Sequence, residues 1–260
     1  MKKIMQFFKV YLQALLLAIF SFTLGILLSK CRFLFYKICY HFGLNTGIYK
    51  KRIPVVSITD IVPNRQNIEM IHAINTDGDI SIYELITINL LVAHFKPTQI
   101  FEFGTYQGRT TVNMLLNSPQ NASVHTIDLP ADNMNDVSLQ LDSGETQYIQ
   151  KATVGKYIHL CKEKNRITQL LGDTGKFDFS PYHNQMDLVF IDASHTEQYV
   201  KNDTEIAFKL IKKGGVLIWH DYGQWDGVTK VLNRYFQNNA ACKNMKAIDK
   251  TSMVFLKTEQ

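Results

Sequence analysis

Two kinds of hydrophobic pattern divide this chain. Residues 10–28 form one continuous apolar run, in which only Gln13, Ser21 and Thr23 carry polar side chains. From residue 99 onward, apolar runs of four or five residues alternate with longer stretches whose apolar positions recur at helical spacing. Short buried strands that alternate with helices predict an α/β fold, with a doubly wound, mostly parallel sheet.

The elements of the predicted sheet domain can be placed on the sequence. The expected strands are 100–103, 123–127, 167–171, 188–191, 216–219 and 253–256. The clearest helix covers 196–213, and the glycine pair at 214 and 215 is its expected end. An earlier helix is expected to begin after Ser81, because Ser81 and Glu84 have the spacing of a capping box.

The apolar run at the N-terminus has the length of a helix that spans a bilayer. Lys30, Arg32 and Lys37 follow it among aromatic residues, as is typical of the headgroup layer. A cleaved secretory signal is the alternative, but no small-x-small cleavage site follows the run. We therefore predict an uncleaved transmembrane helix. The charge on its two sides is similar and does not indicate an orientation.

These patterns predict three parts of the chain. Residues 1–44 would be a membrane anchor with its juxtamembrane segment. Residues 45–80 are loop-like, with two prolines and an Asp-Gly-Asp turn, and would be a linker that also provides a lid. Residues 81–260 would be the globular domain.

The excess of basic over acidic residues lies at the N-terminus. Residues 1–59 contain nine Lys or Arg and no acid, so the rest of the chain has a net charge of −4 although the whole carries +5. A mildly acidic body does not favour a nucleic-acid partner. The cysteines, which are Cys31, Cys39, Cys161 and Cys242, have no C-x-x-C spacing. They indicate reduced thiols in the cytoplasm and neither a zinc site nor a disulfide framework.

The stretch 99–108, QIFEFGTYQG, has the features of a first βα turn in an open parallel sheet. An apolar run contains Glu102, two glycines follow at 104 and 108, and a helix is expected from Arg109. The spacing G-x-x-x-G differs from the G-x-G-x-x-G of dinucleotide sites. A carboxylate at this position suits a ligand that carries a cationic amine. The alternative is a turn whose glycines serve the backbone geometry alone.

Two further acids follow predicted strands. Asp128 ends the second strand, twenty-four residues after Gly104, where an acid can accept the hydroxyls of a ribose. Asp173 follows the third strand and is placed to accept an adenine amino group. Each acid also has a structural alternative, as a cap or as a turn residue that accepts from its own backbone.

The fourth and fifth predicted strands end in the segments 192–195, DASH, and 220–222, HDY. Neighbouring strand ends are expected to bring Asp192, His195, His220 and Asp221 together. Carboxylates with an imidazole can hold an oxygen-preferring divalent ion such as Mg²⁺ or Mn²⁺. The alternative is a hydrogen-bond network that only stiffens these loops.

These motifs, in this order over about residues 80–256, resemble the class I S-adenosylmethionine-dependent methyltransferases. Within them the chain most resembles the bacterial group of macrocin-type sugar O-methyltransferases and cephalosporin-hydroxylase-like proteins. The resemblance implies a Rossmann-like fold with a seven-stranded sheet whose last strand is antiparallel. Residues 81–260 would then be the methyltransferase domain.

The resemblance also implies a role for each candidate residue. The residues that would contact S-adenosylmethionine are Glu102, Gly104, Thr105, Gly108, Asp128 and Asp173. By likeness to catechol-type O-methyltransferases, the metal ligands would be Asp192, His220 and Asp221, with His195 as the general base. The chain departs from that type by having His in place of the Lys base and His-Asp in place of the Asp-Asn ligands. Asp203 is typical of the group and receives no role.

The sequence therefore predicts a membrane-anchored O-methyltransferase whose catalytic domain lies in the cytoplasm. Its cofactors would be S-adenosylmethionine and Mg²⁺ or Mn²⁺, and its acceptor a small molecule or a lipid-linked sugar. One alternative is a catalytically silent ligand-binding or scaffold protein on the same fold. Another is a nucleotide-sugar or NAD enzyme, against which the missing G-x-G-x-x-G argues. The sequence leaves the oligomeric state open.

Overall fold

The computed structural model describes residues 2–28, 31, 35, 38, 50–74, 76–142, 145–151 and 153–259. The chain divides into two compact units, 1–49 and 50–260, and each is described by itself. The residues expected in the headgroup layer, Lys30, Arg32 and Lys37, lie outside the described residues, as does Cys39.

The first unit contains the helix α1 (Lys2–Phe22) and the 3₁₀ helix η1 (Leu24–Leu27). Thr23 interrupts the α-helix between them, and its hydroxyl donates to the carbonyl of Ile19 at 2.7 Å. The α-helix therefore ends inside the apolar run that was expected to continue to residue 28. Among the described residues, no helix is long and apolar enough to cross a membrane, so the predicted transmembrane helix is not found.

The second unit is built on one sheet, which has eight strands within the described residues. They are β1 (Val55–Val56), β2 (Gln99–Phe103), β3 (Ser123–Asp128), β4 (Ile167–Leu171), β5 (Met186–Ile191), β6 (Ile211–Trp219), β7 (Lys246–Ile248) and β8 (Val254–Lys257). Their order is β1-β7-β8-β6-β5-β2-β3-β4. β8 is antiparallel to β6 and β7, and the other neighbours are parallel. The predicted count of seven is wrong because β1, from the expected linker, pairs with β7.

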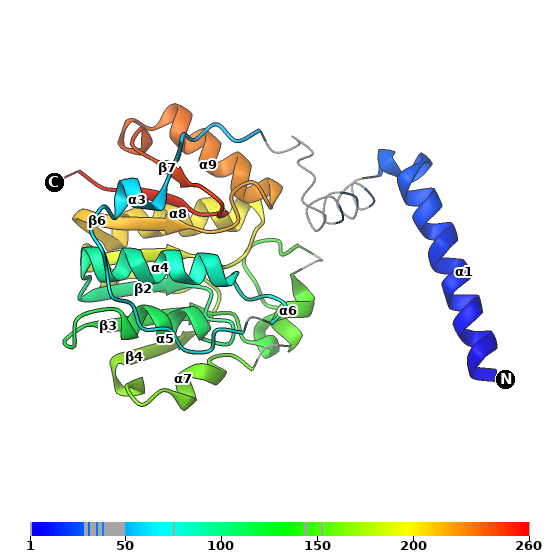
Figure 1. Ribbon diagram of the computed structural model, residues 1–260, viewed down its shortest axis with the longest axis horizontal. Coiled ribbons are helices and arrows are strands. Elements are labelled where there is room, and N and C mark those ends of the chain that lie inside the picture. The colour runs from blue at the N-terminus through cyan, green and yellow to red at the C-terminus, as the bar shows by residue number, and fades with distance from the viewer. Residues whose placement is uncertain are drawn as a thin grey trace. The chain divides into compact units, whose positions relative to one another are not determined.

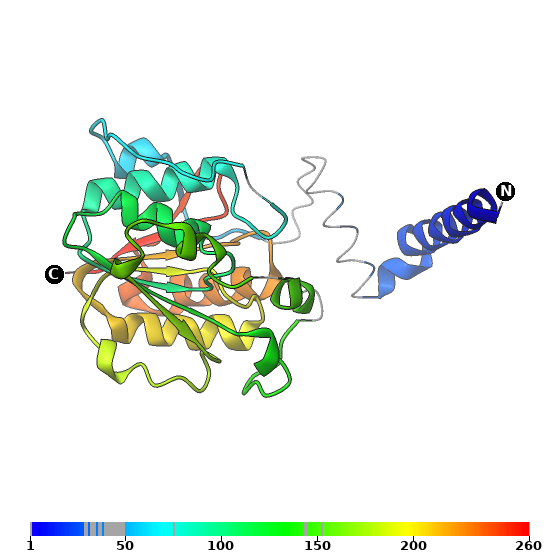
Figure 2. The ribbon, with the colours of Figure 1, turned by 90° about the horizontal axis from the view of Figure 1, so that it is seen from below.

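Helices lie on both faces of this sheet (Figures 1 and 2). The helices of this unit, within the described residues, are α3 (Ile58–Ile61), α4 (Ile82–Phe95), α5 (Arg109–Leu116), α6 (Thr146–Lys151), α7 (Lys156–Leu160), α8 (Glu197–Leu210) and α9 (Asp226–Asn238). Short 3₁₀ helices are η2 (Ala131–Asn133), η3 (Lys164–Arg166), η4 (Ser180–Tyr182) and η5 (Ala240–Cys242). Figure 2 shows α4 and α5 on one face and α8 and α9 on the other. The fold is thus the doubly wound α/β sheet that the sequence predicts.

Two helix boundaries show how the local sequence acts. Ser81 caps α4 as expected: its hydroxyl accepts from the N–H of Glu84, and the carboxylate of Glu84 accepts from the N–H of Ser81 at 3.0 Å. At the other boundary, α8 ends at Leu210 and β6 begins at Ile211, five residues before the predicted strand. Ile211 pairs with Met186 of β5 and is buried, so its apolar side chain serves the sheet and not the helix.

Arg109, at the start of α5, binds the segment before α4 through hydrogen bonds. Its side chain is only 2% exposed. Its guanidinium donates to three carbonyls, those of His72 (2.7 Å), Ile80 (2.8 Å) and Ala73 (3.1 Å). The end of the predicted linker is therefore held at a fixed place, while its role as a lid stays a prediction.

The strand order changes direction at β2. From β2 the chain continues to β3 and β4 at one edge, and then returns to β5 on the other side of β2. Parallel strands that diverge in this way leave a crevice beyond their carboxyl ends, where such sheets bind ligands. The predicted site residues follow these strand ends.

Candidate active site

The turn after β2 lies directly against the end of β5. Gly104 has φ +92°, and a Cβ built on it would lie 2.0 Å from the carbonyl oxygen of Asp192. The backbone N–H of Asp192 donates to the carbonyl of Phe103 at 2.9 Å. Only glycine permits this conformation together with this approach. Gly104 is therefore required by the packing of two strand ends, whatever ligand binds beside them.

The second glycine of the motif, Gly108, has φ +82° and is the N-cap of α5. A Cβ at this position would lie 2.7 Å from the side chain of Ile158 in α7. The backbone N–H of Tyr157 also donates to the carbonyl of Gln107 at 2.8 Å. The turn is thus fastened to α7, and the side of Gly108 that a Cβ would occupy faces protein.

Glu102 is fully buried in β2 and is bound by hydroxyl groups. Its Oε2 accepts from Thr126 Oγ1 at 2.6 Å and from the hydroxyl of Thr111. Thr126 Oγ1 lies in turn 2.7 Å from Thr105 Oγ1. Burial raises the pKa of Glu102 to about 8, although the two hydroxyls act in the opposite direction. Its Oε1 has no hydrogen-bond partner within the described part of the chain.

Asp128, the last residue of β3, holds the backbone of the glycine turn. Its Oδ2 accepts from the N–H of Tyr106 at 2.5 Å, and its Oδ1 accepts from the N–H of Leu129 at 2.8 Å. Tyr106 has φ +46°, so this carboxylate stabilises an unusual conformation. Burial raises the pKa of Asp128 to about 6, although the backbone donors act in the opposite direction. An ionised carboxylate has further lone pairs that can accept hydroxyl groups.

Asp173 follows β4 and is bound on both oxygens. It accepts from the N–H of Ser138 at 2.6 Å, the N–H of Gly175 at 2.9 Å and the hydroxyl of Tyr199 at 2.8 Å. Burial opposes ionisation, but these donors outweigh it and lower the pKa of Asp173. The bond from Gly175 is the turn contact that the structural alternative describes, and the other two connect the loop after β3 with α8.

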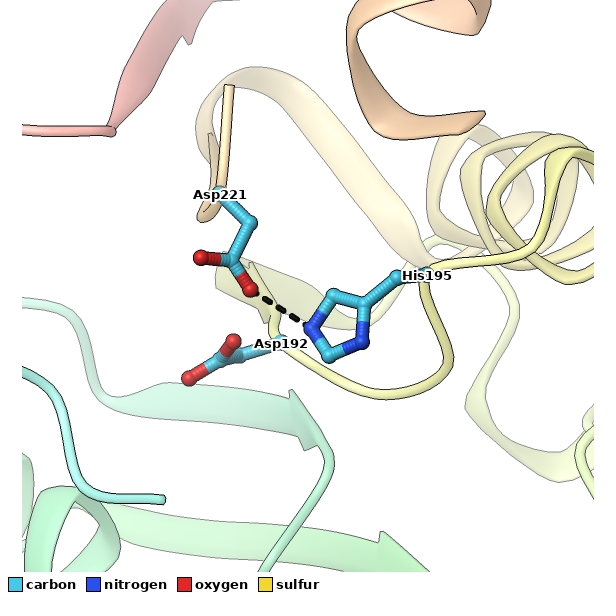
Figure 3. Close-up of side chains that lie close together, drawn as sticks. All are labelled: Asp192, His195 and Asp221. Carbon is cyan, nitrogen blue, oxygen red and sulfur yellow. Dashed lines mark ion pairs between the residues drawn. The ribbon is translucent and has the colours of Figure 1, made fainter. Parts of the chain in front are cut away.

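The four residues expected after β5 and β6 do converge. Three of them are drawn in Figure 3, where the side chains of Asp192, His195 and Asp221 face one another. One ligand atom from each of the three lies within 4.8 Å of the others. His195 Nε2 lies 2.5 Å from Asp221 Oδ2. Within the part of the chain that the structure describes, these three residues could hold a cation.

His220 contacts the same two acids through Nδ1, which lies 3.0 Å from Asp192 Oδ1 and 3.4 Å from Asp221 Oδ1. Its other nitrogen, Nε2, lies 3.3 Å from Glu84 Oε1. The geometry therefore offers His195 as a third ligand beside the expected His220. Which of the two histidines binds an ion stays a prediction.

Three side chains of this site were not found from the sequence. Glu145, just before α6, contacts His195 Nδ1 at 2.8 Å through Oε1. Trp225 stacks on the ring of His195, with centroids 4.4 Å apart and an angle of 9°. Glu84 carries a recognisable capping signal, but that pattern does not show that its second oxygen faces His220. Glu145 and Trp225 lie in loops, where no periodic pattern marks them.

Asp221 combines burial with an unusual backbone. It is 7% exposed and has φ +65°, which costs energy for a residue with a Cβ. Its N–H is oriented toward Ser252 Oγ at 3.3 Å, and its carbonyl accepts from the N–H groups of Gln224 and Trp225. These contacts hold the strained residue, and such strain is concentrated at functional sites.

The charges of this site favour a bound cation. Burial lowers the pKa of His195, but Asp221 and Glu145 outweigh it and raise that pKa to about 10. His220 is affected in the same way by Asp192 and Asp221, which raise its pKa well above the usual value. The surrounding acids therefore favour the protonated form of both imidazoles. The four carboxylates around them, Glu84, Glu145, Asp192 and Asp221, still outnumber the positive charges. Carboxylate oxygens with an imidazole fit Mg²⁺ or Mn²⁺ in donor type and charge.

The chain is similar to known methyltransferases in sequence and in fold. Residues 101–222 match the family model described as a methyltransferase domain. No curated protein matches the chain. Among solved structures, an SAH-bound methyltransferase from Podospora anserina is 12% identical, with a TM-score of 0.50, over 71% of this chain and 81% of that one. An O-methyltransferase from Bacillus cereus in complex with SAH is 17% identical, with a TM-score of 0.49, over 70% and 84%.

The matched region extends from β2 to the residue after Asp221, so it contains the glycine turn, Asp128 and the acidic cluster. The last strand of the sheet, β8, is antiparallel to β6, as the resemblance implied. Residues 101–222 match a methyltransferase domain, and together with the methyltransferase-like fold this match supports an S-adenosylmethionine-dependent methyltransferase.

Proposed function

We propose that this enzyme transfers the methyl group to a hydroxyl oxygen, with a divalent cation bound at Asp192 and Asp221. The observation that carries the proposal is the convergence of Asp192, Asp221 and His195 Nε2 at the carboxyl ends of β5 and β6. This cluster lies beside the glycine turn, because Gly104 packs on the backbone of Asp192. A hydroxyl acceptor needs this chemistry, since it must lose a proton to become a good nucleophile.

S-adenosylmethionine supplies an electrophilic methyl group, so the protein has to bind it, orient it and exclude water. We place its ribose at Asp128, whose remaining lone pairs can accept hydroxyl groups. We place its amine near Glu102, where Oε1 is buried and unpartnered among the described residues. A cationic amine there would offset the burial that raises the pKa of Glu102. The SAH-bound Podospora anserina methyltransferase, which shares the fold, supports this class of ligand.

His195 is the proposed general base. Its Nε2 points toward the two acids, and its ring is held flat against Trp225. A base must be deprotonated, whereas the acids around His195 raise its pKa. A cation at Asp192 and Asp221 would supply positive charge, lowering the pKa of His195 and of a nearby hydroxyl. The Nε2 of His195 would then accept the proton of the acceptor hydroxyl.

The acceptor and the location of the enzyme rest on the sequence. The resemblance to sugar O-methyltransferases favours a sugar hydroxyl, free or lipid-linked. The apolar run of residues 10–28 favours a membrane location with the methyltransferase domain in the cytoplasm. The apolar side chains of α1 support this, because Leu12, Leu16 and Leu17 are each more than half exposed. Fractionation of cells that express the full chain tests the location.

The activity is tested with purified full-length protein, labelled S-adenosylmethionine and extracts of membrane and soluble fractions. The account expects label on a hydroxyl oxygen, loss of transfer in EDTA, and its return with Mg²⁺ or Mn²⁺. Full transfer in EDTA would remove the cation from the mechanism. Tight binding of S-adenosylmethionine without any transfer would instead support a silent ligand-binding protein.

A further inference from the structure

Three consecutive basic residues begin the second unit, beside the loop that carries Asp221. This basic segment consists of Lys50, Lys51 and Arg52. Its backbone is held at two points: the N–H of Arg52 donates to the hydroxyl of Tyr222 at 2.8 Å, and the carbonyl of Lys50 accepts from Asn233 Nδ2 at 2.8 Å. Tyr222 is buried and follows Asp221 directly. The basic segment is therefore fixed next to a proposed ligand of the cation.

The side chain of Lys51 extends along this loop. A Cβ built on Gly223 would lie 1.9 Å from Lys51 Cε and 2.7 Å from its Nζ, so the lysine lies directly against the backbone of Gly223. Lys51 Nζ also lies 5.7 Å from the ring centroid of Tyr222, within the range of a cation–π contact. The ammonium is thus held two residues from Asp221.

The charges of the basic segment are unpaired. None of its three side chains forms an ion pair with the residues that the structure describes. Partial burial lowers the pKa of Lys51, although the charge of Glu84, which contacts His220 Nε2 at 3.3 Å, acts in the opposite direction. An ammonium that has lost part of its water without gaining a carboxylate favours an anion that arrives with the substrate.

We infer that the basic segment binds a phosphate group of the acceptor, with the ammonium of Lys51 as the main contact. This inference rests on the proposed function and names the class of its acceptor, a sugar that carries a phosphate. Three neighbouring positive charges suit a group that spreads about two negative charges over several oxygens, as phosphate does and a single carboxylate does not. Two sources offer this chemistry, the diphosphate of a lipid-linked sugar and a soluble sugar phosphate.

The contacts also give the acceptor a direction. Lys51 is exposed, whereas Asp221, two residues before Gly223, is buried. A phosphate on Lys51 therefore stays at the outer side of the loop, and the sugar attached to it extends inward. Its hydroxyl would then reach Asp221 and His195, whose Nε2 lies 2.5 Å from Asp221 Oδ2.

The alternative is that Lys51 only covers Gly223 and Tyr222 with its apolar stem. Lys51→Met keeps such a stem and removes the charge, while Lys51→Arg keeps the charge. Lys243→Met is the matched control, because Lys243 Nζ lies 5.6 Å from the ring centroid of Phe236 and its loss removes a comparable contact elsewhere in the unit. If Lys51 is merely structural, Lys51→Met lowers the thermal stability and leaves anion binding unchanged.

The first test is titration calorimetry of the full-length protein with inorganic pyrophosphate, in EDTA so that no divalent ion binds the probe. We expect Lys51→Met to bind pyrophosphate roughly 10- to 150-fold more weakly than the wild type, as is usual for the loss of a contact between charged groups. Lys51→Arg and Lys243→Met should bind it like the wild type. Equal affinity in Lys51→Met and the wild type, or a wild type that does not bind pyrophosphate, would overturn the inference.

The second test is mass spectrometry of the product that the wild type labels in cell extracts. A labelled product that carries phosphate supports the inference: its recovery in the organic phase identifies a lipid-linked acceptor, and its recovery in the aqueous phase a soluble sugar phosphate. A labelled product without phosphate would overturn the assignment and leave the methyl transfer intact. A wild type that binds pyrophosphate through Lys51 but transfers no methyl group would reject the proposed function and uphold the phosphate site.

Discussion

His195 Nε2 lies 2.5 Å from Asp221 Oδ2, although the two residues follow different strands of the sheet, β5 and β6. Register explains the meeting, because Ile191 and Trp219, which precede the two loops, are paired neighbours. The contact connects the proposed base to a proposed ligand of the cation. The protonation of one therefore depends on what occupies the other.

The first prediction concerns the cation. Asp221→Asn should weaken the binding of Mn²⁺ by more than about tenfold. A loss of about tenfold is the lower end for residues that only hydrogen-bond to the ligands of a metal, and Asp221 is proposed as a ligand itself. The matched control is Asp187→Asn, at the opposite end of β5, where the carboxylate pairs with Lys212 at 2.8 Å. Titration calorimetry with Mn²⁺ measures both. Equal Mn²⁺ affinity in Asp221→Asn and the wild type would remove Asp221 from the site.

A second prediction follows from the buried carboxyl of Glu102, whose pKa is raised to about 8. The folded state then keeps a proton that the unfolded chain loses near pH 4.5. The contribution of Glu102 to stability is full below that pH and is lost as the pH rises toward 8, by up to about 1.4 kcal/mol per pH unit. Glu102→Gln should flatten the pH dependence of the free energy of unfolding, measured without ligand. If the free energy of unfolding of Glu102→Gln depends on pH with the same slope as that of the wild type, the carboxyl of Glu102 is ionised in the folded protein.

The third prediction compares two glycines. Gly104→Ala should cost about 2–5 kcal/mol of stability, since the Cβ would overlap the backbone of Asp192 and φ is positive. Gly172→Ala should cost no more than about 0.5 kcal/mol, because its Cβ would meet Phe177 at an ordinary 3.6 Å. Urea unfolding measures the difference. Similar midpoints for the two variants would mean that the turn after β2 can move away from β5.

Arg109 supports a fourth prediction. Arg109→Met should destabilise the protein by about 3 kcal/mol, since the buried carbonyl of Ile80 and the part-buried carbonyls of His72 and Ala73 would lose their charged donor. It should also speed proteolytic cleavage within residues 72–80. If this segment is cleaved at the same rate in the wild type and Arg109→Met, its anchoring does not depend on the guanidinium.

The elements that the sequence predicted best are those whose local signal agrees with their environment. β4 matches its predicted range, and the capping box of Ser81 begins α4 as expected. β7 has only three residues, and β1 has two, so neither is long enough to show a pattern. Their strand pairing comes from long-range contact, which a local pattern does not contain.

The candidate site divides in the same way. Asp128, Asp192 and Asp221 follow apolar runs, so their place at the strand ends could be predicted. The place of Glu145 could not be predicted. It depends on how the loop before α6 folds onto His195, which lies fifty residues further along the chain. The sequence also could not show that the acids raise the pKa of His195, because that effect depends on distances of a few ångströms.

The central claim is that this chain binds S-adenosylmethionine at the carboxyl ends of β2 and β3. Titration calorimetry of the full-length protein with S-adenosylmethionine and with NAD, for the wild type and Asp128→Ala, tests it most directly. We expect the wild type to bind S-adenosylmethionine and not NAD. Asp128→Ala should bind it roughly 10- to 150-fold more weakly, as is usual for the loss of hydrogen bonds to a charged group, about 1.5–3 kcal/mol. Binding of NAD in place of S-adenosylmethionine, or an unchanged affinity in Asp128→Ala, would contradict the account.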